Sequence, residues 1–205
     1  LTGTGQVDDM VVDDYNSMLY RRIRTSAGPH GRVTPAGEFY VPVGASTNVA
    51  VVPDAYYRVG AVAVDGEAAG APAVYTFTDV WDEHTLAAEF AERLTSSGVP
   101  ELWLHGLNPL WTDNFEAHAK ADTDGDGVPN EQEYVAGTDA TNRLSVFAVS
   151  LAVSNGLPVV SFPTVPAGGF YGLGGARRYA LEEADDLSAG NWQGVAGLDN
   201  VPGSG

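Results

Sequence analysis

The chain contains no cysteine among its 205 residues. Disulfide bonds, thiolate metal sites and a cysteine nucleophile are therefore excluded. It also has no continuous run of about 18 apolar residues, so we predict no membrane-spanning segment. Its four histidines show none of the close spacings of zinc sites, and no serine lies in a Gly-x-Ser-x-Gly setting. These absences predict that the protein is not an enzyme.

Positive charge is scarce as well. Ten lysines and arginines stand against 27 aspartates and glutamates, which gives a formal net charge of −17. Such a surface repels the phosphates of nucleic acids and of anionic lipids, so neither is expected as a partner. It attracts divalent cations and suits a chain that stays soluble outside the cell. We therefore predict a secreted protein, either extracellular or on a cell surface.

Glycine and proline are frequent, at 25 and 12 residues, and they separate short β-branched runs. This pattern is typical of strands and turns, and it predicts a mainly β fold. The predicted strands are Val7–Val12, Leu19–Thr25, Phe39–Val43, Thr47–Val52, Tyr57–Val64, Val74–Phe77, Val146–Val153, Pro158–Phe162, Arg178–Glu183 and Trp192–Ala196. Turns are predicted at 28–31 and 34–37, and Asp65-Gly66 is a hairpin-type dipeptide.

One segment, Asp82–Leu94, fits two patterns. Leu86, Phe90 and Leu94 recur at helical spacing, with acidic residues at the start of the segment. Leu86, Ala88 and Phe90 also alternate as they would in a strand. From the spacing alone we predict a helix here.

Large apolar side chains are expected to be buried outside the strands as well. In a mixed connector at 95–121 the predicted anchors are Leu102, Trp103, Leu107, Trp111 and Phe115. Core packing is favoured over a sugar-binding platform for all four tryptophans, because each lies among apolar neighbours. They are Trp81, Trp103, Trp111 and Trp192.

Residues 122–133 carry the strongest chemical motif. They read Asp-Thr-Asp-Gly-Asp-Gly-Val-Pro-Asn-Glu-Gln-Glu and match the twelve-residue calcium-loop pattern at every specified position. Three carboxylates this close repel each other unless a cation lies between them. Gly127 permits the sharp turn that brings the oxygens inward. The predicted Ca²⁺ ligands are the carboxylates of Asp122, Asp124, Asp126 and Glu133, the carbonyl of Val128, and Asn130 directly or through water.

Pro129 refines the prediction. In paired EF-hands the residue at this eighth position donates a backbone N–H to a partner loop, and proline has none. No second loop of this kind occurs in the chain. A short helix is predicted after the loop, with Gly137 able to end it. We therefore predict a single structural ion that stiffens the junction between two domains, not a cooperative sensor.

Four stretches between residues 25 and 91 occur in a recognisable order and spacing. They are Thr25-Ser-Ala-Gly-Pro-His-Gly-Arg-Val-Thr-Pro-Ala-Gly37, Pro53-Asp-Ala-Tyr-Tyr-Arg-Val59, Val64-Asp-Gly66 and Tyr75-Thr-Phe-Thr-Asp-Val80. With them, segment 26–91 resembles a divergent internalin B-type bacterial repeat. The resemblance implies a small β-rich module of secreted bacterial surface proteins, without a catalytic role. It also implies a closing strand at Glu83–Phe90, in place of the helix.

A second unit spans residues 100–147. A short tryptophan-rich helical stretch precedes Ala121-Asp-Thr-Asp-Gly-Asp-Gly127 and Glu133-Tyr-Val-Ala-Gly-Thr-Asp139. This unit resembles a thrombospondin type-3-like or dockerin-like calcium loop, with Ala140 where members usually have proline. The resemblance implies the same calcium ligands. Such units normally precede a fibronectin-like β-sandwich near the end of large secreted proteins.

Segment 144–205 resembles the first part of such a sandwich, through Arg178-Tyr-Ala-Leu-Glu-Glu-Ala-Asp-Asp-Leu187 and Asn191-Trp192. The strands that would follow resemble residues 3–24 of this same chain, and Leu1-Thr-Gly-Thr-Gly5 overlays Val201-Pro-Gly-Ser-Gly205. We therefore hypothesise a sandwich split between the two ends of the chain. A further period of a tandem protein, a strand from a neighbouring subunit in a head-to-tail filament, or closure of the chain on itself would complete it.

The predicted organisation has five parts. They are terminal sandwich strands at 1–25, an internalin B-like repeat at 26–91, a connector at 92–121, the calcium loop and short helix at 122–143, and the first part of a β-sandwich at 144–205. The expected function is that of an extracellular calcium-binding structural or surface protein, a repeating unit of a fibre or filament whose partners are copies of itself. The alternatives are a non-catalytic accessory region of a large secreted enzyme, with polysaccharide as its ligand, and an adhesin.

Overall fold

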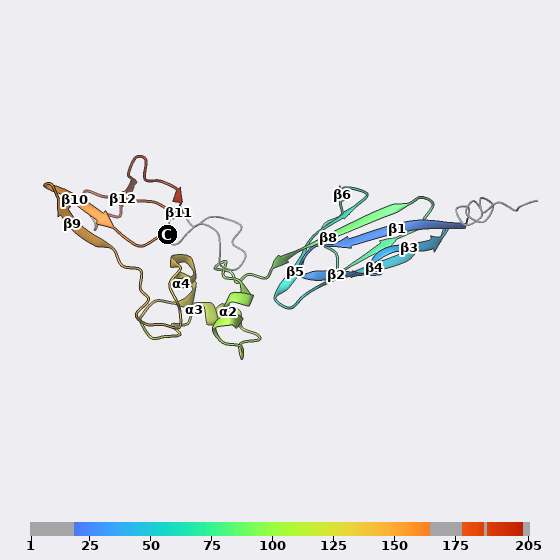
Figure 1. Ribbon diagram of the computed structural model, residues 1–205, viewed down its shortest axis with the longest axis horizontal. Helices are drawn as coiled ribbons and strands as arrows, with labels where there is room; N and C mark the ends of the chain where they lie inside the picture. Colours follow the sequence, from blue (N-terminus) through green and yellow to red (C-terminus); the bar gives the residue numbers. More distant parts are fainter. Residues whose placement is uncertain (1–18, 165–177, 187, 203–205) are drawn as a thin grey trace, which may run out of the picture. The chain divides into compact units, whose positions relative to one another are not determined.

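The computed structural model describes residues 19–164, 178–186 and 188–202. The chain divides into two compact units, Leu1–Arg93 (unit 1) and Leu94–Gly205 (unit 2), and each is described by itself. Among the described residues strands predominate and helices are few and short (Figure 1). The fold is mainly β, as the composition predicted.

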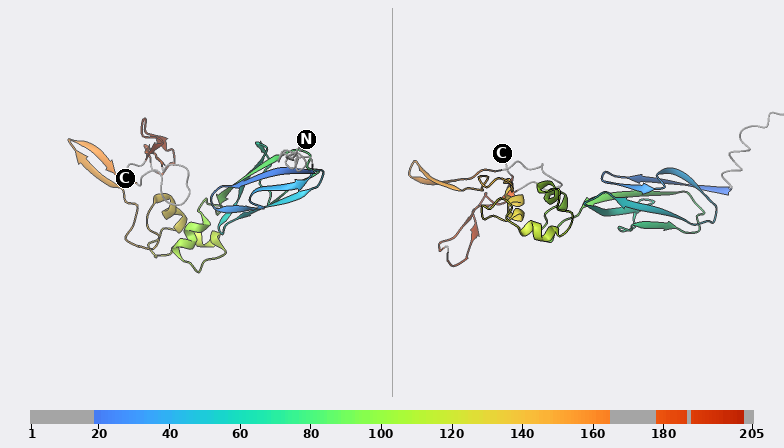
Figure 2. Two further views of the ribbon diagram at one scale, coloured as in Figure 1. Left: turned by 45° about the vertical axis from the view of Figure 1, so that its right-hand side comes forward. Right: turned by 90° about the horizontal axis from the view of Figure 1, so that it is seen from below.

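Unit 1 is built from two sheets that face each other (Figure 2). Its strands are β1 (Tyr20–Ala27), β2 (Gly31–Thr34), β3 (Gly37–Pro42), β4 (Thr47–Pro53), β5 (Tyr57–Val64), β6 (Glu67–Ala68), β7 (Val74–Phe77) and β8 (His84–Glu92). The larger sheet has the order β3-β1-β8-β5-β6 and the smaller sheet the order β2-β4-β7. The pairs are antiparallel except for β1 and β8, which run parallel.

The core of unit 1 lies between the sheets, because alternate side chains of each strand point inward. Ile23, Val62 and Leu86 of the larger sheet and Val49 and Val51 of the smaller sheet are at most 2% exposed. Their neighbours along the strands are mostly half-buried or exposed. Unit 1 therefore has a closed apolar core of its own.

Asp82–Leu94 does not form a helix, so the prediction from residue spacing is wrong, and the strand implied by the resemblance is present as β8. This strand is paired on both sides, parallel to β1 and antiparallel to β5. Leu86 and Ala88 are buried, while Thr85 and Ala87 are exposed. Two hydrogen-bonded ladders and one buried face outweigh a weak helical spacing, since tertiary packing overrides local propensity.

Strand β1 belongs to unit 1, which corrects the domain boundary predicted at residue 25. Tyr20–Thr25 pairs with Gly37–Pro42, and Ile23 is completely buried in the core. The physical reason is that β1 lies between β3 and β8, so the larger sheet would be interrupted without it. The predicted strand Val7–Val12 lies outside the described residues.

Turn chemistry was easier to predict than short strands. Asp65-Gly66 forms the predicted two-residue loop between β5 and β6, with φ of 53° and 85°, as a hairpin turn of this kind requires. Strand β2 lies between the turns predicted at 28–31 and 34–37 and was missed. Its four residues carry too little alternation to stand out between glycine and proline.

Unit 2 begins with a small helical part. Its helices are α2 (Glu101–Leu107), α3 (Phe115–Lys120) and α4 (Asn130–Ala136). They pack through five buried side chains, Trp103, Leu104, Phe115, Ala119 and Tyr134. The rings of Trp103 and Tyr134 meet edge to face with centroids 5.0 Å apart. None of the helices in the described part of the chain is long and apolar enough to cross a membrane.

The apolar anchors predicted for the connector are partly right. Trp103 and Phe115 are buried, whereas the other three, Leu102, Leu107 and Trp111, are half-buried. Leu104 is completely buried and was not predicted. A seven-residue helix offers too few turns for its inner face to be read from the sequence.

Two of the four tryptophans do not pack in a core, so that prediction is wrong for them. Trp81, which follows β7, and Trp192, near the end of the chain, are 64% and 49% exposed. Apolar neighbours in the sequence do not ensure burial in a loop, because no strand or helix fixes the direction of the side chain.

The remainder of unit 2 consists of short strands. They are β9 (Ser150–Ser154), β10 (Leu157–Ser161), β11 (Arg178–Tyr179), β12 (Glu182–Glu183), β13 (Gln193–Gly194) and β14 (Val201–Pro202). They form three separate two-stranded sheets, β9 with β10, β11 with β14, and β12 with β13. Of the strands predicted here, β10 has the predicted length but begins one residue earlier, and the other three are present only as shorter strands. No described residue after Ala140 is buried. This part therefore lacks a core among the described residues.

The place of β1 can be tested by substitution. Ile23→Ala should lower the free energy of unfolding of unit 1 by about 2–5 kcal/mol, because it leaves a cavity at the centre of the sandwich. Arg24→Ala on the exposed face of the same strand is the control, and loss of its solvent-exposed ion pair with Glu38 should have little effect. Urea-dependent hydrogen exchange of β3 and β8 measures both. Equal effects of the two substitutions would contradict the assignment of β1 to this core.

One ionic contact fastens α3 to the start of unit 2. Glu116 accepts hydrogen bonds from the Ser96 hydroxyl at 2.6 Å and from the Ser96 backbone N–H at 2.8 Å. Lys120 Nζ lies 2.9 Å from the same carboxylate. The Ser96 hydroxyl, then Lys120 and the Ser96 N–H, lower the pKa of Glu116 to about 2.

This contact predicts a pH dependence. Because the folded-state pKa of Glu116 lies below its ordinary value of 4.5, its stabilising effect is present above pH 4.5 and is lost as the pH falls toward 2. Glu116→Gln should therefore lower the melting temperature of unit 2 at pH 7, and the difference from the native chain should shrink below pH 4.5. Asp113→Asn, which removes an exposed charge nearby, is the control. A difference that persists unchanged to pH 2 would argue against the ionic origin.

Candidate metal centre

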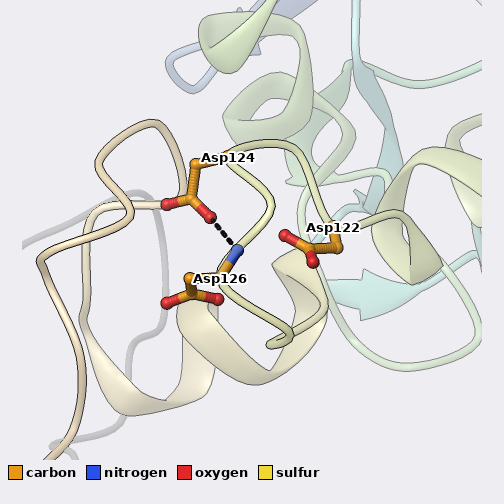
Figure 3. Close-up of side chains that lie close together, drawn as sticks. All are labelled: Asp122, Asp124 and Asp126. Carbon is orange, nitrogen blue, oxygen red and sulfur yellow. Dashed lines mark hydrogen bonds between the residues drawn. The ribbon is translucent and has the colours of Figure 1, made fainter.

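Asp122, Asp124 and Asp126 come together in one loop between α3 and α4. One carboxylate oxygen from each lies within 4.8 Å of the others (Figure 3). Asp122 is exposed, and the other two are half-buried. Carboxylate oxygens at this separation are the hard ligands that divalent cations such as Ca²⁺ take. The cluster could therefore hold a metal ion.

Hydrogen bonds within the loop fix the positions of these carboxylates. The Gly125 and Gly127 N–H groups donate to the two oxygens of Asp122 at 2.8 and 2.9 Å. The Asp126 N–H donates to Asp124 Oδ1 at 3.1 Å, the bond drawn in Figure 3. Gly127 has φ of 97°, a backbone conformation that residues with a side chain rarely adopt. This explains why glycine occupies the sharp turn. The chain itself therefore gathers the three acids.

The N–H groups also explain the protonation state of Asp122. The hydrogen bond from the Gly127 N–H has the largest effect and lowers the pKa of Asp122. Burial raises this pKa, the Gly125 N–H lowers it further, and the result lies below the ordinary value. The carboxylate is thus ionised at neutral pH and available to a cation.

Glu133, the fourth predicted carboxylate ligand, lies in α4 directly after the loop. Its side chain is 0% exposed, and Thr138 Oγ1 donates a hydrogen bond to Oε1 at 3.0 Å. The other oxygen, Oε2, is buried without a hydrogen-bond partner. Burial first, and then the charges of the three aspartates, raise the pKa of Glu133. A buried carboxylate under the electrostatic influence of three more acids needs a positive partner.

The Asn130 side chain, like that of Glu133, has hydrogen-bond partners for only one of its two polar atoms. It is 0% exposed, and its Nδ2 donates to the His118 carbonyl and to Thr123 Oγ1, each at 2.8 Å. These bonds orient the amide and leave Oδ1 buried without a partner. Asp124 and Asp126 each have one oxygen in the same condition. Such groups are rare in folded proteins and call for an ion or water.

Val128 and Pro129 link the loop to the helix. The Val128 N–H donates to Asp126 Oδ1 at 2.8 Å, which holds this peptide against the cluster. Pro129 stands at the N-cap of α4, where its fixed φ suits a helix start, and the Asn130 N–H donates to the Ala121 carbonyl at 2.8 Å. Gly137 ends α4 in the left-handed conformation with φ of 77°, as predicted.

The predicted metal ligands therefore lie in one region of unit 2, on one loop and the helix that follows it. The supporting residues were not predicted. Thr138, which holds Glu133, and Thr123 and His118, which hold Asn130, have no place in the loop pattern. A threonine five residues after an acid becomes its neighbour only because the chain turns at Gly137.

Comparison with known proteins finds no family model, no curated protein and no solved structure that matches the chain. The resemblances to an internalin B-type repeat and to a dockerin-like calcium loop thus stay predictions from the sequence. What can be said of the site rests on its own geometry.

The metal-free protein provides a test of the buried charge. Because the folded-state pKa of Glu133 is raised, the carboxylate disfavours folding as the pH rises above 4.5. Glu133→Gln should therefore raise the melting temperature of unit 2 at pH 7 in the presence of a chelator, and the gain should vanish at pH 4. Calorimetry at both values measures this. A variant that is less stable than the native chain at pH 7 without metal would contradict the account.

Proposed function

We propose that the protein is an extracellular structural module in which one Ca²⁺ ion holds the helical part of unit 2 together. The observation that carries this proposal is the completely buried Glu133, which has one oxygen without a hydrogen-bond partner and a pKa that the charges of the three aspartates help to raise. An uncompensated buried charge of this kind costs several kcal/mol, and a cation removes the cost.

The donor set favours Ca²⁺ over other metals. It offers one oxygen from each of Asp122, Asp124 and Asp126, two from Glu133, the Val128 carbonyl, and Asn130. Calcium takes roughly six to eight oxygens in flexible geometry, whereas magnesium needs a strict octahedron and keeps its waters. Zinc prefers nitrogen and sulfur ligands, and the ligand set contains neither histidine nor cysteine. Calcium is therefore the ion we assign.

The role we assign to the ion is mechanical. Its ligands lie on the loop and on α4, and the Asn130 amide joins both to the carbonyl of His118 in α3. Helices of six or seven residues are not stable by themselves, so they depend on such a centre. An ion that binds only the folded state stabilises it by about 2.7 kcal/mol at a concentration 100 times its Kd.

The remainder of the proposal concerns location and assembly. A net charge of −17 and the absence of cysteine and of a long apolar run are compatible with a secreted chain. The exposed apolar strands of unit 2 call for a partner, and copies of the same chain would supply it in a fibre or filament. In this proposal the protein has no catalytic role, and its function is to span distance and to assemble with other copies.

A second candidate is a non-catalytic carbohydrate-binding or adhesive module. It is favoured by the exposure of Trp81, at 64%, and of Tyr40, at 61%, on unit 1. Exposed aromatic rings are the surfaces on which sugars stack. A soluble polysaccharide that shifts the fluorescence of the native chain but not that of Trp81→Ala would favour this function over the fibre.

The calcium proposal is tested by isothermal titration of the full chain, with melting temperatures in calcium and in chelator. One site per chain is expected, and calcium should raise the melting temperature of unit 2. Glu133→Gln should weaken binding at least about tenfold, since it removes a bidentate ligand. Asp113→Asn, which removes one exposed charge outside the loop, should bind like the native chain. Absence of both heat and stabilisation would refute the proposal.

A further inference from the structure

The side chain of Asn130 uses both of its amide hydrogens. Nδ2 donates one to the backbone carbonyl of His118 and one to Thr123 Oγ1, each at 2.8 Å. An asparagine amide has two N–H donors, so none is left over. Turning the amide over would set Oδ1 against the His118 carbonyl, and two acceptors repel each other. The orientation of the amide is therefore fixed, and Oδ1 is the atom that has no hydrogen-bond partner.

The contact with Thr123 places this amide at the calcium loop. Thr123 lies between Asp122 and Asp124 in the chain, so the Asn130 side chain lies against the first half of the loop. The Asn130 backbone is held as well, through its N–H bond to the Ala121 carbonyl. Asn130 is 0% exposed, so a water between Oδ1 and an ion would have to be a buried one with several polar partners of its own. Direct contact between Oδ1 and the ion has no such requirement.

The hydrogen bonds also explain why this residue is asparagine and not aspartate. An amide donates two hydrogen bonds through its nitrogen and still offers an oxygen to a cation. An ionised carboxylate only accepts, so it would set one oxygen against the carbonyl of His118. It would also add a fifth negative charge to the four predicted carboxylate ligands, in a completely buried position.

The same amide connects the loop to the helices. His118 lies in α3, and its ring stacks on Trp111 with centroids 4.1 Å apart and 8° between the planes. The Trp111 carbonyl lies 3.0 Å from Nδ1 of His105 in α2. Asn130 itself is the first residue of α4. These contacts therefore run from Asn130 through α3 to α2.

We propose that Asn130 binds Ca²⁺ directly through Oδ1, and that Thr123 and the His118 carbonyl position it. The ion, the amide and α3 are then joined without a water between them. Thr123 does not contact the ion and is a positioning residue, as outer partners of metal ligands commonly are. This inference rests on the proposed calcium-binding function and names the residue that couples the ion to the helices.

Calorimetric titration of the full chain with Ca²⁺ gives the first test. Asn130→Asp should weaken binding at least about tenfold, although it adds a negative charge, because the His118 carbonyl and the other carboxylates repel the new one. Asn142→Asp is the matched control. It adds the same charge at an exposed position of unit 2, where a carboxylate can still accept the hydrogen bond from the Leu144 N–H. It should bind at least as tightly as the native chain, and equally tight binding by Asn130→Asp would overturn the inference.

Eu³⁺ in place of Ca²⁺ distinguishes direct from water-mediated contact, since its luminescence lifetimes in H₂O and D₂O count the waters bound to the ion. Asn130→Ala should bind Eu³⁺ with one more water than the native chain does, because water replaces the lost oxygen. An unchanged count would mean that the side chain reaches the ion only through water, and direct ligation would then be wrong.

The positioning role is tested at an exposed residue, where folding is not at risk. Thr123→Val removes the hydroxyl and should weaken Ca²⁺ binding about tenfold. Thr123→Ser keeps the hydroxyl and should restore native affinity, while Thr112→Val, at another exposed threonine, should have no effect. Loss of affinity that serine does not restore would contradict a role for the hydrogen bond.

The outcomes separate this inference from the proposed function. A native chain that binds neither Ca²⁺ nor Eu³⁺ refutes the calcium site, and with it the role of Asn130. A native chain that binds both ions, with Asn130→Asp as tight as the control or with no added water in Asn130→Ala, leaves the calcium site intact and refutes direct ligation by Asn130 alone.

Discussion

A carboxylate buried without compensation is the constraint on which the first half of unit 2 depends. Glu133 is completely covered, and its partner Thr138 satisfies only one of its oxygens. The surrounding hydrogen bonds do not relieve this charge. They leave further oxygens buried without a partner, one on Asn130 and one on each of two aspartates. Folding of the region and charge balance at the loop are therefore coupled, because neither α3 nor α4 is long enough to persist alone.

The two β regions of the chain solve the burial of apolar side chains in different ways. In unit 1, two sheets face each other and cover Ile23, Val49 and Leu86 completely. In the ribbon of β9 and β10, residues of the same type and the same alternation remain in contact with water. The difference does not lie in composition. It lies in the number of strands brought together, since among the described residues the ribbon pairs with no further strand.

Features that depend on residues close together in the sequence could be predicted, and features that depend on distant residues could not. The clustering of Asp122, Asp124 and Asp126 could be predicted because the three residues are local and each position of the loop pattern has a fixed chemical role. The Asp65-Gly66 turn and the helix end at Gly137 were readable for the same reason. The place of β1 was not, because it depends on pairing with β8, which lies some sixty residues further along the chain. Burial of Leu104 and exposure of Trp81 likewise depend on packing that a sequence pattern does not contain.

The parallel pairing of β1 and β8 has a mechanical consequence. β1 begins at Tyr20 and β8 ends at Glu92, and because the two paired strands run parallel these residues lie at opposite ends of the pair. Tension applied between these ends acts along the ladder and loads the β1–β8 hydrogen bonds in shear, all at once. In a hairpin whose ends lie together, the same tension would open the bonds one after another. Unit 1 is thus arranged to resist stretching along its own length, whatever holds it at either end.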